Sequence, residues 1–172
     1  PQTMSAERWL VQNNLSKVDV ILDLTGEADV RWHIDRARYD SPCPLLIGWM
    51  EPYVAAAHAC ILLSETPWIQ ESLDLMKDLE AVTWPDEILR QEPGCSSRFQ
   101  SYTAAAAAHA VALIAENALK LIDGTNCEQS SRIVSWVRGQ QFLDNHWPGL
   151  ALRTWAKVAA PHDGLTMERP FP

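Results

Sequence analysis

The chain has 172 residues, of which 47% are hydrophobic and 21% charged, enough for one domain with a substantial core. Its formal net charge of −8, without any cluster of basic residues, argues against nucleic acid or a membrane surface as a partner. We expect no membrane span, because no apolar run reaches the roughly 18 residues required. The polar first residues predict no signal peptide, and a start at Pro1 is typical of a fragment of a longer protein.

The first half of the sequence predicts strands and helices in alternation. Short apolar and β-branched runs are typical of buried strands in a parallel sheet, and Ser5 is a suitable N-cap for the first helix. Strand, helix and strand in this order form a βαβ unit, for which a right-handed crossover is expected. The strands are expected at 18–24, 45–49 and 58–63, and the helices at 6–14 and 27–38.

The second half predicts two helices, a long loop and one further strand. Apolar spacing favours a helix over 68–79, and Thr103 can cap a long helix over 104–122. Between them, 83–101 is rich in Pro, Gly and Ser, and a loop of this length is usually functional or mobile. A strand is expected at 133–137, and the tail at 160–172, with three prolines, should be extended.

These elements predict a single α/β domain over 1–172. We expect a partial Rossmann-like sheet flanked by helices, with an irregular C-terminal segment. The four cysteines include no CxxC pair, which indicates free thiols in a reducing compartment and a cytoplasmic protein, with no metal site.

The first candidate site is the turn Thr25-Gly26-Glu27, after the first predicted strand. Ligands of open α/β sheets bind beyond the carboxyl ends of the strands, and a glycine there lets the backbone approach a nucleotide. The ordinary alternative is that Gly26 only permits a tight turn. The chain contains no GxGxxG and no GxxxxGK(S/T) motif, so it holds no recognisable phosphate-binding loop.

The second candidate is Cys95, which lies in the long loop shortly before the 104–122 helix. A thiol near a helix N-terminus can act as a nucleophile, although an ordinary loop cysteine is the simpler interpretation. Cys127 is the runner-up, since it lies in a polar turn. Glu51 and His58, at the ends of two predicted strands, form a third candidate, for which a buried structural role is the commoner outcome.

The residues 18–35 resemble a segment of the ThiF/MoeB-type, ubiquitin-activating-like superfamily that is usually written DVVxDCTDNxxxRxxxN. Asp23, Thr25 and Arg31 match its Asp, Thr and Arg, and Asp35 stands at its Asn. Residues 44–63 are similar to the strands that follow in that family, in its bacterial branch linked to conjugation operons. Residues 104–124 resemble its late helix, which ends in a Lys-Leu-x-x-Gly pattern.

The resemblance implies the C-terminal half of an enzyme that uses ATP and Mg to adenylate the C-terminal glycine of a ubiquitin-like or sulfur-carrier protein. In many members a cysteine in the loop before the late helix then accepts the acyl group, and Cys95 occupies that place. Three departures weigh against full activity. The family's Mg-ATP aspartate falls at Gly26, and the resemblance offers neighbouring Glu27 as its substitute; the zinc-binding CxxC pairs are missing; and the nucleotide loop is absent.

The resemblance also implies partners. We expect association with the missing N-terminal half, a homodimer, and a conjugating-enzyme-like or JAB-peptidase-like partner. Two other interpretations stay open at this point. One is a non-catalytic ThiF-like interaction or scaffold domain, and the other is a fragment of a nicotinamide-dependent dehydrogenase.

Overall fold

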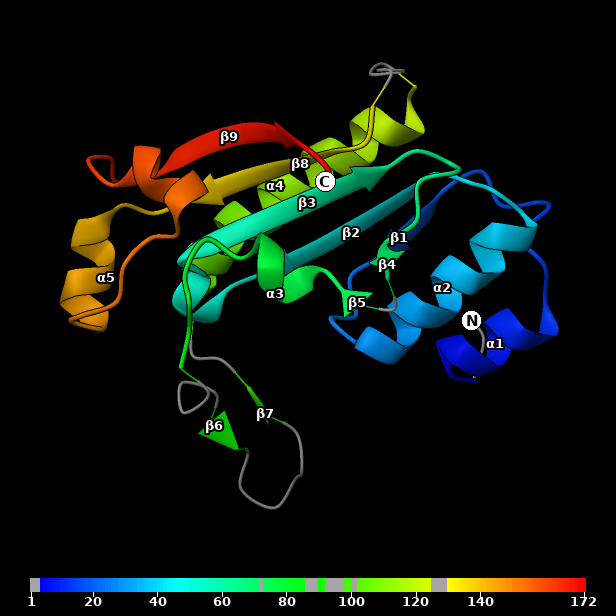
Figure 1. Cartoon of the computed structure of the whole chain (residues 1–172), viewed down its shortest axis with the longest axis horizontal. Coiled ribbons are helices and arrows are strands. Elements are labelled where there is room, and N and C mark those ends of the chain that lie inside the picture. The colour runs from blue at the N-terminus through cyan, green and yellow to red at the C-terminus, as the bar shows by residue number, and fades with distance from the viewer. Residues whose placement is uncertain (1–3, 72, 86–89, 92–97, 100–101, 125–129) are drawn as a thin grey trace.

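The computed structural model describes residues 4–71, 73–85, 90–91, 98–99, 102–124 and 130–172 (Figure 1). A five-stranded sheet has the order β1-β2-β3-β8-β9, and two small antiparallel pairs, β4–β5 and β6–β7, lie outside it. The sheet strands are β1 (Ile21–Asp23), β2 (Leu45–Met50), β3 (Ala56–Leu62), β8 (Arg132–Val137) and β9 (Leu165–Pro170), and the small pairs are β4 (Ile69–Gln70), β5 (Leu73–Asp74), β6 (Arg90–Gln91) and β7 (Arg98–Phe99). The helices are α1 (Ala6–Gln12), α2 (Ala28–Asp40), α3 (Met76–Leu79), α4 (Ala104–Ile122), α5 (Gln140–His146) and the 3-10 helices η1 (Pro52–Val54) and η3 (Thr154–Ala159).

The sheet is mixed. β1 and β2 are parallel and joined through α2, as predicted for a βαβ unit. The pairs β2–β3, β3–β8 and β8–β9 are all antiparallel, so the expected parallel sheet is limited to its first pair. An α/β fold with a mixed sheet flanked by helices is compatible with a Rossmann-like architecture, as expected.

The two faces of the sheet are covered by different helices. On one face, Val30 and Ile34 of α2 pack with Leu45 and Ile47 of β2. On the other face, Leu46 of β2 packs against α4. Because successive strand residues point to opposite faces, one apolar strand such as β2 supplies both cores. Figure 1 shows α4 behind the sheet and α2 in front of it.

Two sequence predictions are wrong. The helix expected over 68–79 is instead the pair β4–β5 followed by the four-residue α3. The backbone N–H groups of Trp68 and Ile69 donate to Asp35 of α2, at 2.9 Å and 2.7 Å, and this tertiary anchoring overrides the helical spacing. The C-terminal segment, expected to be irregular, is extended but forms strand β9, whose backbone pairs with β8 along its length.

The helix expected over 104–122 is confirmed as α4, with the Thr103 Oγ1 hydroxyl accepting from the Ala106 N–H at 3.1 Å. By length and composition alone α4 could cross a membrane, although no such run was expected from the sequence. Its exposed residues include Val111, Leu119 and Ile122, so this helix is apolar on more than the side that packs against the sheet. Core helices pass the same test, which makes it weak evidence of a span.

Candidate functional site

Asp23, the last residue of β1, stabilises the turn that follows this strand. Asp23, which is 2% exposed, accepts hydrogen bonds at Oδ1 from the Thr25 N–H at 3.0 Å and from the Thr25 hydroxyl at 2.7 Å. Thr25 Oγ1 accepts from the Glu27 N–H at 3.2 Å, and Gly26 adopts a φ of 74°, in the left-handed region that glycine tolerates best. These bonds form an Asx-type turn, which fixes the start of α2 and leaves the Glu27 side chain exposed.

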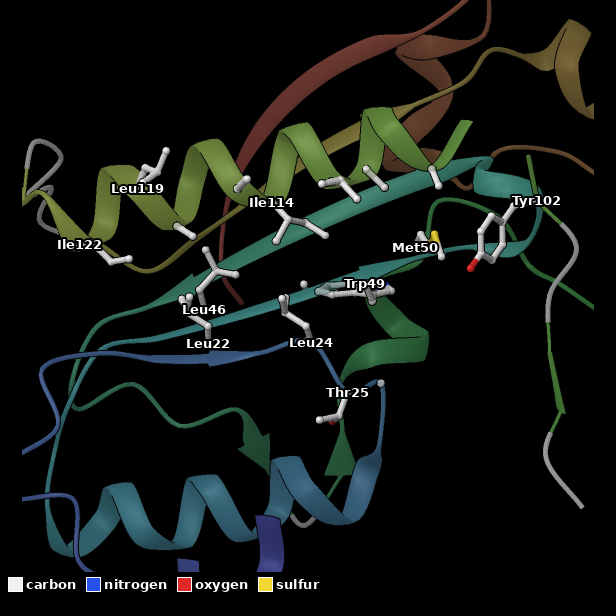
Figure 2. A pocket seen from close by; sticks show the side chains of 17 residues that line it. Leu22, Leu24, Thr25, Leu46, Trp49, Met50, Tyr102, Ile114, Leu119 and Ile122 are labelled. Atoms are coloured by element: carbon white, nitrogen blue, oxygen red, sulfur yellow. The ribbon is translucent and has the colours of Figure 1, made fainter. Parts of the chain in front are cut away.

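An apolar groove of about 830 Å³ runs beside this turn, between α4 and the parallel strands β1 and β2 (Figure 2). Thr25 and Gly26 line it, so two of the three residues predicted at the turn border the groove, and Glu27 is their neighbour. Ile114 and Leu119 of α4 form part of the opposite wall. Among the described residues, no charged side chain lines the groove, which therefore suits an apolar segment better than a free ionic ligand.

Gly48 makes the floor of the groove possible. A Cβ atom at this position would lie 2.7 Å from Leu24 Cδ2 and 2.8 Å from Ile114 Cγ2. A larger residue at this position of β2 would therefore require the side chains of Leu24, after β1, and Ile114, on α4, to shift. Figure 2 shows both side chains directed into the space between the strands and the helix.

The groove is open along the side of β1. In the sheet that the described residues form, β1 is an edge strand that pairs only with β2. Leu24 and Leu119, on the two walls, are each 59% exposed. An unpaired strand edge beside a contiguous apolar surface is typical of a site that another polypeptide covers. The sequence predicted β1 as a fully buried strand, and this prediction is wrong for Leu22 and Leu24, because nothing in the described structure covers this face of β1.

Two residues of the ThiF-like motif have structural roles. Arg31, which is buried, donates from Nε to Asp74 Oδ2 at 2.8 Å and pairs with the same oxygen from Nη2 at 2.7 Å. Asp35 accepts from the backbone of Trp68 and Ile69. Both therefore anchor the β4–β5 connection on the inner face of α2, away from the groove.

The third sequence candidate proves to be a buried network. His58 Nε2 lies 2.8 Å from Glu51 Oε1, and His58 Nδ1 lies 2.8 Å from Ser135 Oγ. The Glu51 carboxylate accepts from His58 Nε2–H, and His58 Nδ1 shares a hydrogen bond with the Ser135 hydroxyl. Glu51, His58 and Ser135 are 1%, 0% and 1% exposed, respectively. The order of groups is that of a hydrolase triad, but such burial leaves no path for a substrate, and the role is structural.

Glu51 also holds the chain that leads into the 83–101 segment. Its carboxylate accepts from the backbone N–H of Ala81, from the Val82 N–H at 3.1 Å and from Trp84 Nε1 at 2.7 Å. With His58 this makes four donors on one buried carboxylate, at a point where β2, β3 and the 81–84 segment meet.

Glu80, beside this network, makes folding stability depend on pH. Burial, and then the charge of Glu51, raise the pKa of Glu80 from 4.5 to about 7, while Arg153 opposes them. Between these values the folded state keeps a proton that the unfolded state has released, so the free energy of unfolding falls as pH rises from 4.5 to about 7. We expect a loss of about 2 kcal/mol over this window, after allowance for partial solvent contact.

Urea unfolding across this pH window measures the effect. In the variant Glu80→Gln the contribution disappears and the pH dependence flattens. Glu65→Gln, at an exposed position with no charged partner nearby, should keep the wild-type dependence. Equal slopes in wild type and Glu80→Gln would contradict this assignment.

The sequence-predicted nucleophile Cys95 and the runner-up Cys127 lie outside the described residues. The two described cysteines, Cys43 and Cys60, are buried, and burial raises the pKa of both thiols, which disfavours the reactive thiolate. Within the described part of the chain, no group of three or more His, Cys, Asp or Glu residues is arranged to hold a metal ion.

The described residues fit Mg-ATP only in part. The exposed Glu27 carboxylate offers an oxygen ligand of the kind Mg²⁺ prefers, and Gly26 keeps the turn open above it. Within the described ranges, no basic side chain lines the groove to receive the phosphates. The sequence predicted the turn but not the groove. Its signal in the sequence was an excess of apolar residues, more than one buried face of a strand or helix requires: Leu22, Leu24, Leu119 and Ile122.

No protein-family model matches the sequence, and no curated protein matches it either.

Proposed function

We propose that this chain is the C-terminal part of a ThiF-type adenylation domain, which activates the C-terminus of a ubiquitin-like or sulfur-carrier protein. The observation that supports it best is one arrangement at the carboxyl end of β1. There the Thr25-Gly26-Glu27 turn meets an apolar groove along α4, and α4 directly follows the segment that contains Cys95. Ligands of open α/β sheets bind at this end of the strands.

The activity joins the carrier's C-terminal carboxylate to the AMP part of ATP and releases pyrophosphate. A cysteine thiolate can then attack the acyl carbon, which forms a thioester and releases AMP. In this proposal Glu27 contributes a carboxylate to Mg²⁺, Thr25 and Gly26 shape the turn, and Cys95 accepts the acyl group. The groups that bind the phosphates belong to an upstream half, because this sequence has no phosphate-binding loop.

The open edge of β1 and the apolar groove give the upstream half a place to pack. A strand added to β1 would satisfy its free backbone groups, and an apolar element would cover the exposed leucines. A homodimer, a cytoplasmic location and a conjugating-enzyme-like or JAB-peptidase-like partner are parts of the same proposal.

A thioester assay tests the role of Cys95. Full-length protein is mixed with a purified ubiquitin-like or sulfur-carrier protein and Mg-ATP, and the products are separated on a non-reducing gel. We expect a carrier adduct that thiol reagents remove and that Cys95→Ala abolishes, because the acyl acceptor is gone.

Cys127→Ala is the matched control and should retain the adduct. If the adduct survives in Cys95→Ala and is lost in Cys127→Ala, the acceptor is misassigned. If no adduct forms although carrier-dependent pyrophosphate exchange is normal, the enzyme stops at the adenylate.

The second candidate function is a non-catalytic, ThiF-like interaction or scaffold domain. The groove itself favours it, since no charged residue of the described part of the chain lines its walls and glycine stands where the family has its Mg-ATP aspartate. This alternative predicts stable association with a partner chain and no pyrophosphate exchange under any condition.

A further inference from the structure

A second, smaller cavity of about 340 Å³ lies where β8 ends and α4 begins. Four ring-bearing residues line it, together with Thr103, Ala106 and Arg138. The rings are those of Tyr53, Tyr102, Phe142 and His146. Tyr102 also borders the apolar groove, but the other six residues do not belong to that site. Its volume is in the range of small-molecule pockets.

Arg138 supplies a positive charge to this cavity. It directly follows β8, and its backbone N–H donates to the Ala55 carbonyl at 2.9 Å. Its guanidinium carbon lies 4.3 Å from the centre of the Phe142 ring and 5.2 Å from that of Trp136. These rings hold the group in place but accept no N–H···O bond.

The charge of Arg138 has no acidic partner in the described part of the chain. Its Nε atom is buried without an acceptor among those residues. Arg138 and Asp163 both line a neighbouring cavity, but no ion pair joins the two among the described residues. Burial lowers the pKa of Arg138, and no nearby carboxylate offsets this effect. In a chain with a formal charge of −8, a partly buried arginine without a carboxylate indicates that an anion completes the site.

The first turn of α4 lies on the same side. Thr103 and Ala106 line the cavity, and this turn begins a helix of 19 residues. The helix dipole makes this end of α4 partially positive. The helix end therefore reinforces the charge of Arg138.

The aromatic residues form a wall suited to a flat ring. Phe142 and His146 are stacked, with ring centres 4.2 Å apart, and the Tyr53 ring lies 6.1 Å from that of His146. Tyr53 and Val54 adopt φ angles of 56° and 54°, which a β-branched residue such as Val54 rarely tolerates. Strained backbone of this kind tends to occur at functional sites.

We propose that this cavity binds a small planar organic anion, an aryl carboxylate or aryl phosphate. Its oxyanion contacts the Arg138 guanidinium near the positive end of α4, and its ring lies against Phe142, His146 and Tyr53. The proposal does not depend on the adenylation activity, because it uses neither the Thr25–Glu27 turn nor Cys95.

Calorimetric titration of the full protein with phenyl phosphate and with benzoate tests this proposal, with neutral phenol as the third probe. We expect at least one anion to bind in the millimolar range or tighter, and phenol to bind at least about tenfold more weakly. Binding of both anions indicates recognition of the shared oxyanion, and binding of one alone identifies the class. Absence of binding by both anions, or equal binding of phenol, would overturn the proposal.

Arg138→Gln should weaken anion binding by at least about tenfold. Arg36→Gln is the matched control, since Arg36 is an exposed arginine that also lies over a ring, 5.6 Å from that of Trp32, and it should bind as wild type does. If the folded Arg138→Gln variant binds the anions with unchanged affinity, Arg138 is not the group that contacts them and the proposal is wrong. If that variant does not fold, amide NMR of the wild type is the test: phenyl phosphate or benzoate must shift the backbone signals of the lining residues Thr103, Ala106 and Arg138, and unshifted signals reject the site.

Discussion

Glu51→Ala is expected to lower the free energy of unfolding by about 3–5 kcal/mol, the largest stability effect of any single carboxylate in the described structure. The substitution leaves four donors without their acceptor: His58 Nε2, Trp84 Nε1 and the backbone N–H groups of Ala81 and Val82. Because Glu51 is 1% exposed, water cannot replace the lost oxygen atoms without opening the core.

The variant Glu51→Gln tests how much of this stability depends on the negative charge of the side chain and how much on its volume. Glutamine fills the same volume, but its amide NH₂ presents donors to groups that are themselves donors, so a loss of about 2–4 kcal/mol is expected. Denaturant unfolding followed by circular dichroism measures both variants, and Glu65→Gln, at an exposed position, should stay within about 0.5 kcal/mol of wild type. If Glu51→Ala costs less than about 1 kcal/mol, the network does not hold the 81–84 segment.

The same network connects stability to the proposed chemistry. Trp84, which donates to Glu51, stands at the start of the 83–101 segment that contains Cys95. The carboxylate therefore fixes where that segment leaves the fold, although it contacts no residue of the Thr25–Glu27 turn. We expect Glu51 variants that remain folded to affect acyl transfer to Cys95 more than formation of the adenylate.

Local sequence signals were sufficient to predict the elements whose structure depends mainly on their own residues. The Ser5 and Thr103 hydroxyls cap α1 and α4 as predicted. The apolar run at 45–49 appears as β2, because a strand covered on both faces needs little polar character.

The sequence-based prediction was wrong where contacts with residues far away in the chain determine the secondary structure. Residues 68–74 have helical spacing, yet Asp35 and Arg31 of α2 hold them as the β4–β5 pair. Strand β9 was missed because three prolines lie in the tail, although its residues alternate between partly buried and exposed as in a half-buried strand. Its pairing with β8 connects elements that are far apart in the chain, and no local pattern reports such pairing.

Of the candidate site, the sequence predicted the turn but not the groove beside it. The sequence indicated Thr25, Gly26 and Glu27, since a glycine after a strand is a local signal. The groove depends on Gly48 of β2 and Ile114 of α4, which approach each other only in the folded chain. The resemblance likewise emphasised Arg31, whose buried pairing with Asp74 has a structural purpose.

Carrier-dependent ATP–pyrophosphate exchange by the full-length protein tests the proposed activation most directly. The account predicts exchange well above background with a glycine-ending carrier and Mg-ATP, and background exchange by the 172-residue chain alone, which has no phosphate-binding loop. Glu27→Gln should lower exchange by at least about tenfold, through its lost Mg²⁺ ligand, while Glu65→Gln should leave it unchanged. Exchange at background in the full-length protein with every ubiquitin-like or sulfur-carrier protein tried, or clear exchange by the 172-residue chain alone, would contradict the account.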